Sequence, residues 1–199
     1  MLLKNFILVF FLFIFSMAEE NNAMFGLKWK MSQQQIKAIG ISIERINSDK
    51  NLSTYKTYKL PKPISFGESY YLVFDESELV KLGMYSETIE NDPYGTKGKE
   101  LFERIIALMN KTYKLDKTYC TTGNELYEES DEFYECLRYK GCGMWVATFS
   151  DTNKHIIVEL RGLRRGTGFL VITAESNYFD NSSEKYENLK NEDDSKAFE

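Results

Sequence analysis

The chain has 199 residues, of which 30 are acidic and 25 basic, so its formal net charge is −5. A nucleic-acid-binding protein needs an excess of Lys and Arg on one face to meet the phosphates, and this composition supplies none. We therefore expect no nucleic-acid partner. The length suffices for one domain or two small ones with a hydrophobic core.

The first eighteen residues have the pattern of a secretory signal peptide. Lys4 precedes an apolar run over residues 6–15, and residues 16–18, Ser-Met-Ala, supply the small side chains that signal peptidase requires. The apolar stretch is shorter than the roughly 20 residues of a membrane-spanning helix. We expect cleavage after Ala18, no transmembrane span in the mature protein, and a periplasmic or secreted location, with the periplasm favoured.

The first half of the mature chain, residues 19–91, begins with a helix. Ser32 and Gln35 have the spacing of a capping box, and Gly40 marks the end of the helix. Three stretches with alternating apolar and polar residues then predict strands, at residues 54–60, 69–74 and 79–85. Such alternation is typical of an antiparallel meander with one face in water.

The second half, residues 92–174, repeats this order. Residues 98–113 carry the strongest helical stripe of the chain, and the strands that follow are expected at residues 144–149, 155–161 and 168–174. The predicted fold class is therefore α+β, a tandem pseudo-repeat in which each half packs one main helix on a three-stranded antiparallel meander.

The last segment, residues 175–199, has a different composition. It contains eight acids and three lysines, and Leu189 is its only Leu, Ile or Val. Such a segment buries too little apolar surface to offset the entropy of ordering it. We expect an acidic, disordered tail.

A resemblance to a known class of module rests on residues 25–40. They have the pattern Phe25-Gly26-x-x-Trp29-x-Met31-Ser32-x-x-x-Ile36-x-x-x-Gly40. This pattern resembles the entry motif of small exported bacterial modules with one helix and an antiparallel sheet, of the outer-membrane assembly lipoprotein type and the β-lactamase-inhibitor-protein type. The latter is a tandem of helix-plus-sheet units. The chain departs from these modules in lacking a lipobox and in having Lys30 where they usually have glycine. The resemblance implies a binding or inhibitory module rather than an enzyme.

Three cysteines, Cys120, Cys136 and Cys142, lie close together in the sequence. In an oxidising compartment we expect one disulfide and one free thiol, and the sequence leaves all three pairings open. The gaps between these cysteines and His155 match no compact zinc motif, so we expect no metal site.

The enzymatic alternatives depend on few residues. His155 is the only histidine, and acids are frequent over residues 125–135, so a secreted hydrolase using these groups is the second hypothesis. The segment 95–100 resembles a phosphate-binding loop only superficially, because Pro93 occupies the first glycine position and Glu100 replaces the magnesium-binding Ser or Thr. We expect no cofactor and assign no catalytic residue.

The leading hypothesis is a binding or inhibitor-type protein whose partner is another exported or envelope protein. Tyrosines on the first meander could form the contact face, although core packing explains them equally well. The basic turn around residues 161–168 could bind carboxylates or phosphates, or it is a glycine-containing hairpin loop with solvated arginines. A structural factor of the cell envelope is the third possibility. The candidate partner-binding residues are Tyr70, Tyr71, Tyr85, Arg161, Arg164 and Arg165.

Overall fold

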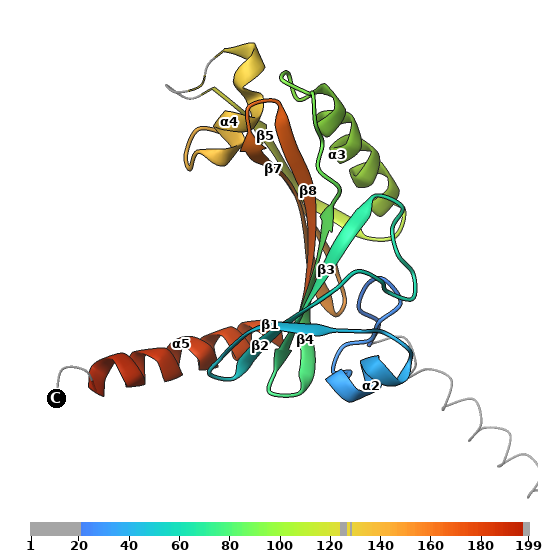
Figure 1. Ribbon diagram of the computed structural model, residues 1–199, viewed down its shortest axis with the longest axis vertical. Coiled ribbons are helices and arrows are strands. Elements are labelled where there is room, and N and C mark those ends of the chain that lie inside the picture. The colour runs from blue at the N-terminus through green and yellow to red at the C-terminus, as the bar shows by residue number, and fades with distance from the viewer. Residues whose placement is uncertain (1–20, 124–126, 128, 197–199) are drawn as a thin grey trace, which may run out of the picture.

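The computed structural model describes residues 21–123, 127 and 129–196, so the predicted signal peptide lies outside the described residues. Eight antiparallel strands form one sheet in the order β1-β2-β3-β4-β8-β7-β6-β5, with helices beside it (Figure 1). The α+β class is confirmed. In chain order the elements are α2 (Gln33–Ala38), β1 (Glu44–Asp49), β2 (Leu52–Thr57), β3 (Gly67–Asp75), β4 (Glu78–Ser86), α3 (Thr96–Met109), β5 (Lys114–Thr121), the 3₁₀ turn η2 (Ser130–Glu132), α4 (Phe133–Arg138), β6 (Met144–Asp151), β7 (Lys154–Arg164), β8 (Thr167–Ser176) and α5 (Phe179–Lys196).

The two predicted halves of three strands each are not seen. β1 and β5 add a fourth strand to each meander, and β4 pairs with β8, so that a single sheet crosses the expected boundary near residue 91. The prediction missed β1 and β5 because they are the edge strands. Nearly all their residues are exposed, so they lack the alternation of apolar and polar residues that marks a half-buried strand.

The core lies between the sheet and the helices on one of its faces. α3 packs on β7 and β8 and buries Phe102 and Ile105, and α2 lies on the same side near the other end of the sheet (Figure 1). The predicted capping box of α2 is confirmed, since the Ser32 hydroxyl accepts from the Gln35 amide and the Gln35 side chain accepts from the Ser32 amide. These helices leave the opposite face of the sheet without a helical layer.

α4 is docked on the sheet by one buried tyrosine in a socket of glycines. A Cβ atom at Gly98, Gly162 or Gly168 would lie 2.2, 1.8 or 2.1 Å from an atom of Tyr134. The Tyr134 hydroxyl donates to Asp92 Oδ2 at 2.9 Å, and the same oxygen accepts from the Gly98 amide at 3.0 Å. Burial, and secondly this hydrogen bond, raise the pKa of Tyr134 well above its usual value. Two glycines of the basic turn, Gly162 and Gly168, therefore serve this close packing.

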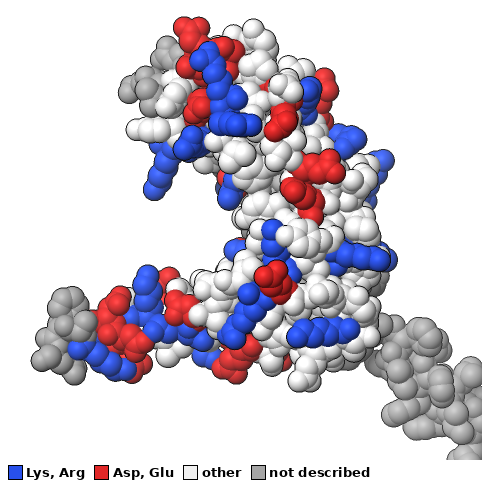
Figure 2. Space-filling model, in the orientation of Figure 1, with Lys and Arg blue, Asp and Glu red and all other residues white. Residues whose placement is uncertain are grey.

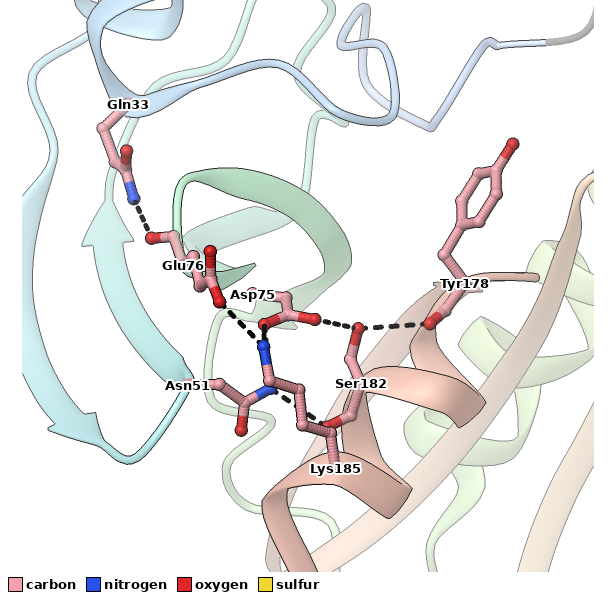
Figure 3. Close-up of polar contacts among 7 residues, drawn as sticks. All are labelled: Gln33, Asn51, Asp75, Glu76, Tyr178, Ser182 and Lys185. Carbon is pink, nitrogen blue, oxygen red and sulfur yellow. Dashed lines mark hydrogen bonds and ion pairs between the residues drawn. The ribbon is translucent and has the colours of Figure 1, made fainter. Parts of the chain in front are cut away.

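The segment expected to be a disordered tail forms helix α5, which projects from the body of the protein (Figure 1). Its attachment is polar (Figure 3). The Ser182 hydroxyl donates to Asp75 at 2.7 Å, the Asn51 side chain donates to the Ser182 carbonyl at 3.2 Å, and Lys185 lies 2.7 Å from Glu76. The composition argument considered apolar burial alone, and it missed these contacts with the tips of the β1–β2 and β3–β4 hairpins.

Candidate protein-binding face

The face of the sheet opposite α3, which we call the open face, carries no helix along its centre in the described part of the chain. α5 reaches only its margin, where the ring of Phe179 lies 4.4 Å from Lys81 Nζ. Figure 2 shows that the molecule is hollowed on this side, between the end that carries α4 and the arm formed by α5. A surface of this shape can receive a convex partner.

Strand pairing defines which side chains line the open face. One row of paired residues crosses all eight strands, from β1 at one side to β5 at the other, and the row beside it runs from β4 to β5. With about 4.8 Å between strands, the part of the first row from Lys56 to Lys117 is about 29 Å long. In order, the first row is Glu44, Lys56, Tyr71, Gly83, Thr173, Ile157, Thr148 and Lys117, and the second is Tyr85, Val171, Glu159, Val146 and Tyr119.

Three aromatic side chains form the apolar centre of the open face. The rings of Tyr71 and Tyr85 have centroids 4.8 Å apart, and those of Tyr85 and Phe169 are stacked at 5.9 Å. All three are half-buried, although no helix covers them. Mutual packing restricts their rotamers, so the cluster presents a rigid apolar area with polar hydroxyl groups, as protein interfaces commonly do.

Gly83 interrupts the first row beside this aromatic cluster. The fold does not demand glycine here, because the backbone is outside the left-handed region and the nearest atoms to a Cβ would be 3.9 Å away. Glycine inside a strand weakens it, and one use of such a glycine is the close approach of another chain or a ligand. A side chain at position 83 would have space beside Tyr85 and the backbone of β8.

The Lys56 side chain, on β2, lies beside two aromatic rings. Its Nζ lies 4.8 Å from the centroid of Tyr58 and 5.7 Å from that of Tyr71. Its hydrogen bond to Tyr58 raises the pKa of Lys56. Glu44 pairs with it across β1 and β2, yet the described residues place no carboxylate within ion-pair distance of this ammonium group.

The acids in the middle of the open face are already paired. Glu159 binds Arg161 at 2.5 Å, and Glu175 binds Lys81 at 2.6 Å. The bond to Glu159 raises the pKa of Arg161. Lys117, at the β5 end of the row, has no ion pair with any described residue. The centre of this face is therefore electrically balanced, and among the described residues of the first row the charges without an ion pair are Lys56, Lys117 and Glu44, the β1 residue opposite Lys56.

The structure brings together some of the predicted contact residues and separates others. Tyr71, Tyr85 and Arg161 share the open face. Tyr70 does not, because it is fully buried on the opposite face and its hydroxyl accepts from the Ile64 amide at 3.1 Å. The period of two along a strand already implies that Tyr70 and Tyr71 point to opposite faces.

The two remaining predicted arginines lie away from the open face, at the turn between β7 and β8. Arg165 pairs with Asp131, and Arg164 lies 3.8 Å from Glu90. They are exposed residues of a hairpin loop whose glycines pack against α4.

The sequence prediction missed four residues of the open face. Phe169 and Gly83 lie within the predicted strands at residues 168–174 and 79–85, but neither is among the candidate contact residues. The lysines could be recognised only from strand pairing across the sheet. The missed residues are Lys56, Gly83, Lys117 and Phe169.

The cysteine pairing that the sequence left open is Cys136 to Cys142, with an S–S distance of 2.15 Å. Cys120 is an exposed free thiol on β5, and desolvation raises its pKa. The described part of the chain contains no group of three or more His, Cys, Asp or Glu side chains that could hold a metal ion. No helix among the described residues is long and apolar enough to cross a membrane.

In the described part of the chain, the histidine and the acids that a hydrolase would use lie far apart. His155 is exposed at the start of β7, whereas Asp131 pairs with Arg165 beyond the end of the same strand. At about 3.3 Å per residue, β7 separates them by roughly 30 Å. Glu125 and Glu128 lie outside the described residues.

No protein-family model, no curated protein and no solved structure matches this chain.

Proposed function

We propose that this chain is an exported, non-catalytic binding protein of the inhibitor type, and that its open face binds another exported or envelope protein. The observation that carries the proposal is Gly83. It lies at mid-strand beside the Tyr71–Tyr85–Phe169 cluster, where the fold has room for a side chain and has none.

Two further features support this function. The Cys136–Cys142 disulfide suits an oxidising compartment, in agreement with the predicted signal peptide and a periplasmic or secreted location. The element order also suits a tandem of helix-plus-sheet units, as in the inhibitor-type modules that residues 25–40 resemble. α2 precedes four strands, and α3 precedes four more, of which the first is separated from the others by η2 and α4. We take each unit to contain four strands instead of three.

The test is a comparative pull-down from the extracellular and envelope fractions of the source organism. The baits are the wild-type protein, Gly83→Gln and Leu108→Gln. Gln at position 83 adds a side chain to the open face where the wild type has none, whereas Leu108 is an exposed residue of α3, on the other side of the sheet. Circular dichroism should show that both variants keep the wild-type fold.

The proposal expects a protein that is recovered with wild type and Leu108→Gln and is lost with Gly83→Gln. Equal recovery with all three baits would show that the open face is not the contact surface. Recovery of nothing above background with the folded wild-type bait would count against a binding function.

A further inference from the structure

The charge distribution of the open face indicates the chemistry of its partner. The whole chain carries a net charge of −5, so a partner chosen by net charge alone would be basic. The open face differs, because its acids Glu159 and Glu175 are already bound to neighbouring bases. Among the described residues of the first row, three have no ion pair: the lysines Lys56 and Lys117, and Glu44, which lies opposite Lys56 on β1 without pairing with it. The free lysines thus outnumber the free acid.

Lys56 is the better positioned of these charges. It is half-buried, and its ammonium group lies near the rings of both Tyr58 and Tyr71. Aromatic rings stabilise a cation but leave it able to form a hydrogen-bonded pair with a carboxylate. Because these contacts restrict the side chain before binding, an arriving carboxylate needs to order little of it.

The distance between Lys56 and Gly83 suits a single protein loop. They are two strands apart in one row, which corresponds to about 10 Å. One loop can therefore place an apolar side chain against Gly83, which has no side chain of its own, and a carboxylate on Lys56. Lys117 lies about 19 Å from Gly83 on the other side, where it adds to the attraction of an acidic surface.

We propose that the open face binds an acidic protein loop, which inserts at Gly83 and pairs an Asp or Glu carboxylate with Lys56. The inference rests on the proposed function, because it names the partner chemistry of the same face. A nucleic acid suits this face less well, since its apolar centre carries paired charges and its free lysines are about 29 Å apart.

The experiment selects ligands from a random library of disulfide-constrained heptapeptides displayed on phage, with the full purified protein as target. Open-face ligands are those that lose binding to Gly83→Gln. Each is then measured against Lys56→Met, Lys56→Arg and Lys111→Met, the last being a matched exposed lysine just after α3. A single-stranded oligonucleotide is measured in parallel.

The inference expects open-face ligands enriched in Asp and Glu, with affinity reduced at least about tenfold by Lys56→Met, largely restored in Lys56→Arg, and unchanged by Lys111→Met. Binding should also weaken as ionic strength rises. Open-face ligands without an acid, or indifferent to Lys56→Met, would overturn the inference and leave the binding function standing. Absence of any ligand sensitive to Gly83→Gln would count against both. Tighter binding of the oligonucleotide than of any selected peptide would overturn the choice of a protein partner.

Discussion

The substitution Gly162→Ala tests the glycine socket that docks α4 on the sheet. The new Cβ would lie 1.8 Å from the backbone oxygen of Tyr134, 2.7 Å from its carbonyl carbon and 3.0 Å from the Arg138 amide nitrogen. These are backbone atoms, so no side chain can rotate away and α4 must move. Overpacking costs about 1–3 kcal/mol, and a displaced Tyr134 also loses its bond to the Asp92 carboxylate, worth about 1.5–3 kcal/mol.

Replacing glycine also restricts the unfolded chain, which stabilises the protein by roughly 0.4–1 kcal/mol, so the free energy of unfolding should fall by about 2–5 kcal/mol. For a domain of this size the midpoint of thermal unfolding should drop by roughly 10 °C. Urea unfolding followed by circular dichroism measures the free energy, and a thermal scan measures the midpoint.

Gly83→Ala is the matched control. Gly83 is also a strand glycine, but the atoms nearest to a Cβ at this position would be 3.9 Å away, which is ordinary van der Waals contact. It should leave stability unchanged or raise it by up to about 1 kcal/mol. If Gly162→Ala unfolds within about 0.5 kcal/mol of wild type, as an ordinary surface substitution does, the close packing of α4 on β7 is refuted.

Three more predictions concern the buried tyrosine, the disulfide and the C-terminal helix. The raised pKa of Tyr134 means that the folded state keeps this proton more strongly than the unfolded state, whose value is near 10.0, so stability should fall as pH rises above that value. Tyr134→Phe should flatten this alkaline loss, and an unchanged urea midpoint profile between pH 9 and 11 would contradict it. Thiol titration in denaturant should find one thiol without reductant and three with it, and Cys136→Ser with Cys142→Ser should cost about 2 kcal/mol, because the closed loop is short. Ser182→Ala removes a polar attachment of α5, so limited proteolysis should cut α5 faster while the thermal midpoint of the sheet stays nearly constant; equal cleavage rates would count against this attachment.

Local periodicity predicted most of the regular elements. The expected helix over residues 98–113 corresponds to α3, and six predicted stretches correspond to β2, β3, β4, β6, β7 and β8. These elements bury one face or stripe, so their sequences must alternate with the period of that structure. α4 was not predicted, since its six residues are too few to show a helical period.

The contact residues were harder to predict, because a side chain's neighbours across a sheet depend on pairing. Tyr85 and Arg161 were singled out for their chemistry, and they share one face only because β4 pairs with β8 and β8 with β7. Lys56 is recognised as a contact residue only from its spatial neighbours. The rings of Tyr58 and Tyr71 lie close to its ammonium group, and no carboxylate of the described residues is within ion-pair distance of it.

The sequence by itself determined which segments form helices and strands, the capping of α2 and the presence of one disulfide at most, because each depends on neighbours along the chain or on simple counting. Tertiary structure alone decided the order of the eight strands, the pairing of Cys136 with Cys142, the order of α5 and the open face with Gly83 in its row. These features depend on contacts between residues far apart in the sequence, and their energies come from packing and hydrogen bonds that no local pattern encodes.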